Sequence, residues 1–199
     1  MIAILDYGSG NILSAARAFA SFTDCEIVND TKSAINAKGL VVPGVGAFNS
    51  CLTQLKQMGG NEIIKERLSM GRPIFGICVG MQILFNEGIE KGNYSGLGLL
   101  PGKIEKLPAS TLPHIGWNTV EYSSQSKLYQ GIKSNYFYFV HSFGYLKQES
   151  DDVEKFAYAD YGARFAASYE SDLITATQFH PEKSGENGLK IIENWVNNL

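Results

Sequence analysis

The sequence predicts an α/β fold: a largely parallel central sheet flanked by helices, with an antiparallel or mixed second half. Two observations support this prediction. In the first half, short runs rich in β-branched residues alternate with amphipathic stretches, which is the rhythm of βαβ units. From about residue 103 onward, candidate strands follow one another with only turns between them.

The first half opens with an expected strand over residues 2–7 and an expected helix over residues 11–22. Asn11 is placed to cap that helix, because asparagine favours the position before the first helical turn. The elements expected next are strands at 25–30, 39–44 and 73–77 and helices at 48–58 and 61–70.

The second half is expected to hold six strands and a terminal helix. The strands are expected at 103–107, 117–122, 136–143, 155–161, 165–170 and 173–179. The helix spans 186–199 and places Leu189, Ile192, Trp195 and Val196 on one apolar face, which predicts packing against the sheet. No repeat, low-complexity tract or linker divides the chain, so we expect one domain over residues 1–199.

Composition excludes several function classes. The chain has 199 residues with 17 basic and 20 acidic side chains, and no block of like charge predicts binding to nucleic acid or to an anionic membrane. No segment approaches the roughly 20 apolar residues of a membrane span, and the start lacks the basic region of a signal peptide. Three cysteines without CxxC spacing favour a reducing compartment, so a cytoplasmic location is expected.

The most informative local pattern is a candidate nucleophile turn around Cys78. An apolar strand runs into Gly76-Ile77-Cys78-Val79-Gly80, and a helical pattern continues through Phe85. Glycines two residues before and after a nucleophile relieve crowding at a sharp strand-to-helix turn. An ordinary cysteine titrates near pH ~8.5, so the helix end and a neighbouring histidine would both be needed to keep a useful fraction of thiolate at neutral pH. Cys25 and Cys51 lack these glycines and are expected to be buried core residues.

A nucleophilic cysteine needs a histidine base and a group that orients it. Of the three histidines, His114, His141 and His180, the last is the best candidate. It ends an expected strand, and the following proline favours an extended conformation at His180. Residues two apart on an extended chain face the same side, so Glu182 is expected to accept from one imidazole nitrogen while the other faces the thiol.

Cofactor and metal sites are not predicted. Gly8 and Gly10 match the first two glycines of a dinucleotide-binding turn, but Leu13 stands at the third position, so that fingerprint fails. The three histidines are widely separated and form no ligand cluster with zinc-like spacing.

Taken together, GICVGMQ at 76–82 and QFHPEKSG at 178–185 resemble the two signatures of class I, triad-type, glutamine amidotransferases. Within that class, four further motifs are similar to those of the glutaminase subunits of imidazole glycerol phosphate synthases. They are DYGSGNI at 6–12, PGVGAF at 43–48, PHIGWN at 113–118 and YFVHSFGY at 138–145. Two positions depart from the common pattern: valine replaces leucine at 79, and phenylalanine replaces tyrosine at 143.

The resemblance implies roles for specific residues. Cys78 would be the nucleophile, His180 the base and Glu182 its orienter. The oxyanion would be stabilised by the backbone N–H of Val79 and by an N–H of the Gly44-Val45-Gly46 loop, although glycine and proline content alone favours a simple turn there. Glutamine would contact Gln82 and the backbone around His141 and Ser142. A peptide of the Gly44-Val45-Gly46 loop is expected to be misoriented in the isolated chain and to turn when the partner has bound its ligand.

The resemblance also implies a partner. L-glutamine would be hydrolysed to glutamate, and its ammonia would pass to a (βα)8-barrel synthase subunit that forms imidazole glycerol phosphate and AICAR in histidine biosynthesis. Asn11, Trp117 and Lys183 are the expected interface residues of this heterodimer. Their ordinary interpretations are a helix cap, a packed tryptophan and a solvated lysine.

Three alternatives stay open at this stage. In the first, the chain is a glutaminase that feeds another synthase, such as one that makes an amino sugar or an aromatic amine. In the second, it is a stand-alone cysteine hydrolase acting on γ-glutamyl bonds. In the third, it is a non-catalytic module that activates its partner by docking alone, which the intact triad disfavours.

Overall fold

The structure is a computed structural model that describes all residues from Met1 to Leu199. Its main sheet has seven strands: β1 (Ile2–Leu5), β2 (Cys25–Val28), β3 (Gly39–Gly44), β4 (Ile74–Cys78), β11 (Phe156–Tyr161), β12 (Ala163–Glu170) and β13 (Ile174–Thr177). Their order across the sheet is β11-β12-β13-β4-β3-β1-β2. The five strands from β13 to β2 are parallel, and β12 and β11 extend the sheet in antiparallel fashion.

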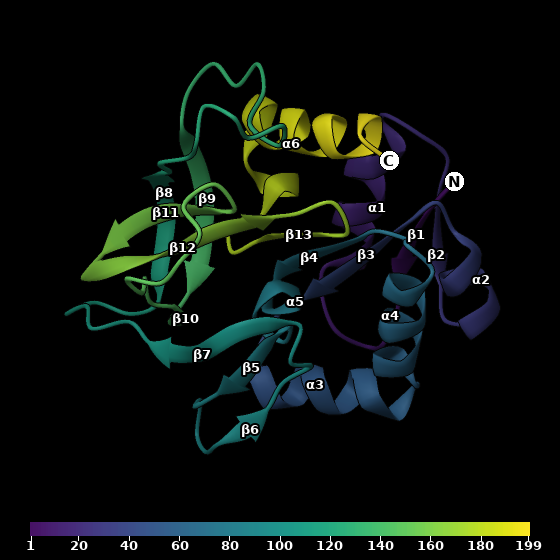
Figure 1. Ribbon diagram of the computed structural model, residues 1–199, viewed down its shortest axis with the longest axis horizontal. Helices are drawn as coiled ribbons and strands as arrows, with labels where there is room; N and C mark the ends of the chain where they lie inside the picture. The colour runs from purple at the N-terminus through teal and green to yellow at the C-terminus, as the bar shows by residue number, and fades with distance from the viewer.

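Helices cover both faces of this sheet (Figure 1). One face carries α1 (Ile12–Ala20) and α6 (Gly185–Asn197), and the other carries α2 (Thr31–Asn36), α3 (Phe48–Gln57) and α4 (Gly60–Ser69). The predicted fold class, a largely parallel sheet flanked by helices, is confirmed. None of these helices has the length and apolar character needed to cross a membrane.

The remaining strands form two smaller sheets beside the main one (Figure 1). The four-stranded sheet contains β5 (Phe85–Gly88), β6 (Tyr94–Ser95), β7 (Leu100–Lys106) and β10 (Phe143–Tyr145), in the order β10-β7-β5-β6. The two-stranded sheet pairs β8 (His114–Thr119) with β9 (Tyr136–His141) in antiparallel register, His114 opposite His141. The second half is therefore mixed, as predicted.

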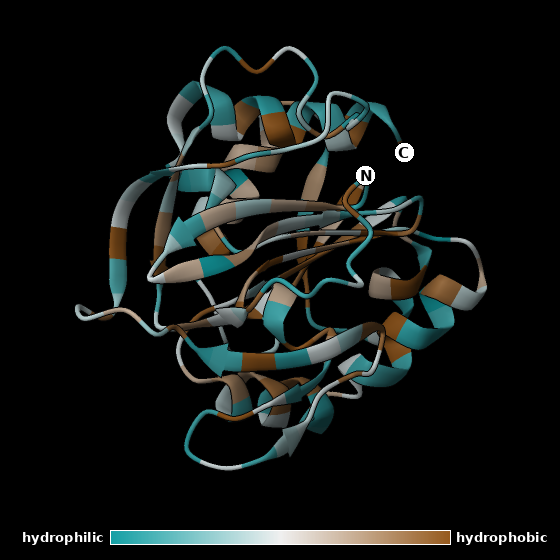
Figure 2. Cartoon of the chain, turned by 60° about the vertical axis from the view of Figure 1, so that its left-hand side comes forward, coloured by the Kyte–Doolittle hydropathy of each residue, from teal (hydrophilic) through white to brown (hydrophobic).

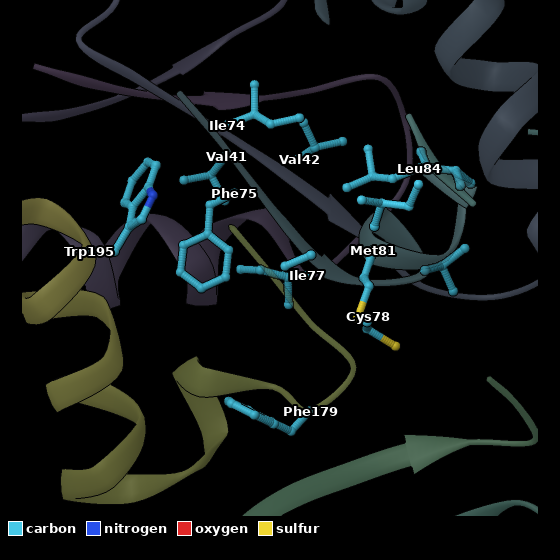
Figure 3. Packing of buried hydrophobic residues seen from close by; sticks show 14 of the residues in the cluster. Val41, Val42, Ile74, Phe75, Ile77, Cys78, Met81, Leu84, Phe179 and Trp195 are labelled. Carbon is cyan, nitrogen blue, oxygen red and sulfur yellow. The ribbon is translucent and has the colours of Figure 1, made fainter. Parts of the chain in front are cut away.

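The core lies between the main sheet and its helices. Strands β1, β3 and β4 are buried at every position, and the hydrophobic colour in Figure 2 concentrates on these inner strands. Phe19 of α1, Phe75 of β4 and Trp195 of α6 pack together with ring centroids 5.2–5.8 Å apart. Figure 3 shows that Cys78 continues the line of buried residues from Phe75 and Ile77 at the end of β4.

Several local predictions are wrong, including the burial of Cys25, which is only partly buried. The prediction missed α2, which is only six residues long, and β5 and β6. Asn11 stands at the N-cap of α1 without a side-chain hydrogen bond, because its φ of −87° and ψ of 68° depart from the extended conformation of a capping residue. Leu189 is 36% exposed, because the buried face of α6 is centred on Gly188, Ile191 and Trp195, about 100° around the helix from it.

Candidate active site

Cys78 stands at a sharp turn between β4 and the single-turn helix α5 (Val79–Gln82). Its φ of 56° is rare for a residue with a side chain and marks a strained backbone. A Cβ added at Gly80 would lie 1.9 Å from the Val42 carbonyl oxygen, and one at Gly76 would lie 2.7 Å from the Gly80 oxygen. Gly80 therefore lets the turn pack directly against β3, and Gly76 lets the strand approach the helix, which is the crowding that the sequence pattern predicted.

The helix after Cys78 is shorter than predicted. It ends at Gln82, and Phe85 begins β5. Backbone N–H groups of residues 97–100 donate to the carbonyl groups of Ile83, Leu84 and Phe85, at 2.8–3.2 Å. These tertiary hydrogen bonds replace the helical ones. A four-residue helix has little macrodipole, so it offers little stabilisation for a negative charge on the sulfur.

His180 and Glu182 meet directly behind the cysteine. His180 is extended (φ −95°, ψ 100°), but Pro181–Lys183 form a 3₁₀ turn rather than continuing the extended chain. That turn brings the Glu182 Oε1 atom to 2.8 Å from Nδ1 of His180, with both side chains 4% exposed or less. The predicted pairing is present, although its geometry comes from a turn and not from strand alternation. The second oxygen, Oε2, is buried without a hydrogen-bond partner.

The parallel pairing of β13 and β4 explains how residues a hundred positions apart converge. Thr177 lies opposite Ile77, so Cys78 and His180 emerge at the same end of the sheet. Both line one pocket of about 300 Å³, and Glu182 lies behind His180. The other residues that line this pocket are Val45, Gly46, Val79, Gln82, Glu90, Pro113, Val140, His141, Ser142, Phe143 and Lys183.

The charges at the site favour a protonated His180. Burial alone lowers the pKa of His180, but the hydrogen bonds and negative charges of Cys78 and Glu182 outweigh it and raise this pKa to about 10. With Nδ1 donating to Glu182, Nε2 is the nitrogen left for the sulfur. The arrangement is suited to holding a proton beside Cys78 and releasing it to a leaving group.

The loop after β3 lies at the pocket mouth. Val45 and Gly46 line the pocket, whereas Gly44 packs against the turn, where an added Cβ would lie 2.6 Å from the Gly80 nitrogen. The Val45 carbonyl accepts hydrogen bonds from the Ser9 hydroxyl and the Cys51 thiol, each at 3.1 Å. The Val45 N–H faces the Ser9 oxygen at 3.5 Å instead of the pocket.

Gln82, His141, Ser142 and Val79 also line the pocket. The ring of His141 is occupied on both nitrogens: Nδ1 donates to the Phe143 carbonyl at 2.9 Å, and Nε2 lies 3.2 Å from Nδ1 of His114. Burial lowers the pKa of His141 to about 3, so the ring is neutral. The backbone N–H of Ser142 remains for a ligand, because the Ser142 carbonyl already accepts from the Leu107 N–H at 3.0 Å.

The three residues expected at a partner interface are all at the surface. Trp117 is 55% exposed on β8, and Asn11 and Lys183 are also exposed. Trp117 lies beside Gly185, just after Lys183, and Asn11 borders a small cavity that reaches His180 and Glu182.

Two polar residues at the site were not predicted. Glu90 lines the pocket, and its Oε2 accepts from the Phe48 N–H at 2.9 Å. No sequence signal distinguishes it from other surface glutamates. Gln178 is buried beside Cys78, and a polar amide inside the apolar run 173–179 was the signal that could have identified it. No group of three or more His, Cys, Asp or Glu residues is placed to hold a metal ion.

Comparison with known proteins agrees with the family resemblance of the sequence motifs. Residues 3–199 match the family described as glutamine amidotransferase class-I. The chain is 48% identical to the "Imidazole glycerol phosphate synthase subunit HisH" of Corynebacterium glutamicum, over 98% of this chain and 97% of that protein. The protein of the same name from Mycobacterium bovis is 45% identical over 100% of this chain and 98% of its own length.

Solved structures share the fold. A chain of the PurLQS structure from Thermotoga maritima superposes with a TM-score of 0.73 at 19% identity, covering 98% of this chain and 97% of that one. A glutamine amidotransferase crystal structure gives a TM-score of 0.72 at 18% identity, over 94% of each chain.

Proposed function

The chain belongs to the class-I glutamine amidotransferase family, and we propose that it is the glutaminase subunit of an imidazole glycerol phosphate synthase. One observation carries the proposal. A chain this similar to HisH proteins places a cysteine on a strained turn beside a histidine that a buried glutamate holds at 2.8 Å. That is the arrangement nucleophilic catalysis requires.

In the proposed reaction, the Cys78 thiolate attacks the side-chain amide carbon of L-glutamine. The tetrahedral intermediate collapses to a thioester as the C–N bond breaks, and His180 gives its proton to the departing ammonia. His180 then takes a proton from water, whose oxygen attacks the thioester and releases glutamate and the free thiolate. Glu182 keeps the imidazole in one tautomer and stabilises its charged form through the Nδ1 contact.

The oxyanion of the intermediate needs donors, and we assign them to the Val79 N–H and to the loop after β3. In this structure the Val45 N–H faces Ser9, and its carbonyl is held by Ser9 and Cys51. The proposal is that docking of an occupied partner turns this peptide toward the pocket. Glutamine hydrolysis measured with and without the synthase and its ligand tests this: stimulation is expected, and full activity of the isolated chain would contradict it.

We propose that the amino acid head group of glutamine is bound by Glu90, Gln82 and the backbone at Ser142. The α-ammonium group of glutamine would lie near Glu90, the one carboxylate that lines the pocket, which accepts from the Phe48 N–H and forms no ion pair. The Gln82 amide nitrogen donates to the Phe143 carbonyl and to Gln178, which leaves the Gln82 carbonyl oxygen to accept a hydrogen bond from the substrate. The backbone N–H of Ser142 completes the proposed binding site.

The proposed partner is a (βα)8-barrel synthase subunit that takes ammonia directly, since ammonia released to water would be protonated. Exposed apolar side chains on β8 and β9, namely Ile115, Trp117 and Tyr136, offer a surface for it beside Lys183. Asn11 lies on the loop before α1. Replacing Lys183 with alanine is expected to weaken partner stimulation more than folding. Unchanged partner affinity and stimulation would exclude a role for this lysine.

The whole proposal has one direct test. The chain is mixed with a barrel synthase and its nucleotide substrate, and glutamine-dependent formation of imidazole glycerol phosphate is measured. A Cys78→Ala control should abolish product formed from glutamine but leave product formed from added ammonia. Glutamine-dependent product that survives in Cys78→Ala would refute the assignment. A cytoplasmic location is part of the proposal and is supported by the three free cysteines.

A further inference from the structure

Gln178 contacts the sulfur that the reaction uses. It lies between β13 and His180, is 1% exposed, and its Nε2 lies 3.7 Å from Sγ of Cys78. Its other amide atom, Oε1, lies 2.9 Å from Nε2 of Gln82. The backbone is anchored as well, because the Gln178 N–H donates to the Ala167 carbonyl at 2.8 Å on β12.

The orientation of this amide is determined by its neighbours. The Phe143 carbonyl can only accept, so the Gln82 atom 2.8 Å from it must be the amide nitrogen. That nitrogen can only donate, so the Gln178 atom facing it must be the oxygen. The remaining Gln178 atom, which faces the sulfur, is therefore an N–H donor.

A second chain of hydrogen bonds holds the starting carbonyl in place. His141 also donates to the Phe143 carbonyl, at 2.9 Å, and His114 donates to Nε2 of His141 at 3.2 Å. Because both rings are buried and neutral, each nitrogen has one defined role. The Gln178 amide is thus held by a network that ends on backbone and has no freedom to reverse.

Two neighbours of the sulfur, the Val140 carbonyl and the Gln178 amide, differ in character. The thiol form can donate to the Val140 carbonyl at 3.9 Å, an acceptor that gives nothing to the thiolate. The Gln178 N–H does the opposite, since a donor favours the charged form of the group it contacts. The helix α5, with four residues, supplies little of the stabilisation that the sequence pattern assigned to it.

We propose that Gln178 is a positioning residue of the glutaminase reaction, whose side-chain amide aims the Cys78 sulfur and stabilises its thiolate. The proton leaves Sγ for Nε2 of His180, and the Gln178 N–H compensates the negative charge that stays on sulfur. This inference rests on the proposed role of Cys78 as the nucleophile.

The test is alkylation of the full-length chain by iodoacetamide over a range of pH, with the modified cysteine identified by mass spectrometry. Gln178→Met keeps the side-chain volume but removes the donor. Its alkylation at Cys78 is expected to be about tenfold slower at mildly acidic pH, the effect of one hydrogen bond to a charged group, with the profile moved to higher pH.

Thr177→Val is the matched control. Its hydroxyl donates to the Phe179 carbonyl at 3.0 Å in the same buried segment and does not touch the sulfur. Its alkylation profile should match that of the unmodified sequence. If both variants shift the profile equally, or if neither does, the amide has no specific role and the inference is wrong.

The design separates this inference from the proposed function. If Cys78 of the unmodified chain reacts no faster than Cys25, the proposed nucleophile itself is wrong. If Cys78 reacts fast in both the unmodified chain and Gln178→Met, only the role of Gln178 fails. With the synthase present, Gln178→Met should lower kcat about tenfold and leave KM within about twofold. A raised KM with unchanged kcat would place Gln178 in substrate binding instead.

Discussion

Nδ1 of His180 lies 2.8 Å from Oε1 of Glu182, and both side chains are almost completely buried. The contact depends on a 3₁₀ turn that places the carboxylate next to a ring two residues earlier. Because the pair is almost completely buried, the Glu182 carboxylate is the acceptor that holds the Nδ1 proton. The behaviour of the site under mutation and pH follows from this pairing.

Glu182→Gln is expected to lower kcat for stimulated glutamine hydrolysis on the order of 10³-fold, because an amide that donates to Nδ1 selects the wrong tautomer. KM should change little. The measurement is glutamate release with the synthase and its ligand, with circular dichroism as the control for folding. A loss of less than about tenfold would show that Glu182 does not orient the base.

Stability should fall as the pH rises, because the folded chain holds a proton on His180 more tightly than the unfolded chain does. The pKa of His180 is raised from 6.5 to about 10, so its stabilising contribution is complete below pH 6.5 and is lost as the pH rises through about 10. The free energy of unfolding from urea titrations measures this. His180→Asn should have a shallower slope in that window, and equal slopes would contradict the shift.

Ser9→Ala combined with Cys51→Ala releases the Val45 carbonyl from both of its side-chain donors. If these contacts hold the loop away from the pocket, the isolated double variant should hydrolyse glutamine about fivefold faster, the effect of about 1 kcal/mol. The rate with the synthase should change less. A slower isolated variant would show that the contacts support the active loop instead.

Arg67→Met should destabilise the fold without touching the site. The fully buried guanidinium donates to the carbonyl groups of Ala34, Ile35, Ala37 and Pro73 at 2.7–2.9 Å. Removing it leaves these carbonyls without that donor, for a loss of about 3 kcal/mol or more in unfolding free energy. Arg17→Met, on the exposed side of α1, is the control. A loss of less than about 1 kcal/mol for Arg67→Met would show that these four hydrogen bonds contribute little to stability.

Alanine substitutions at two glycines near the pocket distinguish the cost of a steric clash from the cost of backbone strain. An added Cβ at Gly80 would meet the Val42 carbonyl oxygen at 1.9 Å, so Gly80→Ala should prevent stable folding. At Gly46 nothing lies within 4 Å, but φ is +93°, so Gly46→Ala should cost only about 1–2 kcal/mol. Thermal unfolding distinguishes them, and similar melting temperatures would contradict this contrast.

Much of the fold was predictable because its signals are local. The buried strands are continuous apolar runs, and α1, α3, α4 and α6 have clear helical periodicity. The errors occur where tertiary contacts override local preference. The pattern after Cys78 stays helical through Phe85, yet hydrogen bonds from residues 97–100 end the helix at Gln82.

The sequence by itself determined the nucleophile turn and the candidate residues Cys78, His180 and Glu182, because glycine spacing and a proline act over a few residues. Only the tertiary structure decided that Gln178 and Glu90 belong to the site and which atom of the Gln178 amide faces the sulfur. The Gln178 contacts join the segment after β13 to β4, α5 and β10, and Glu90 contacts the start of α3. The register of these segments and the limited ways in which donors and acceptors can pair set the contacts, and neither can be found along the chain.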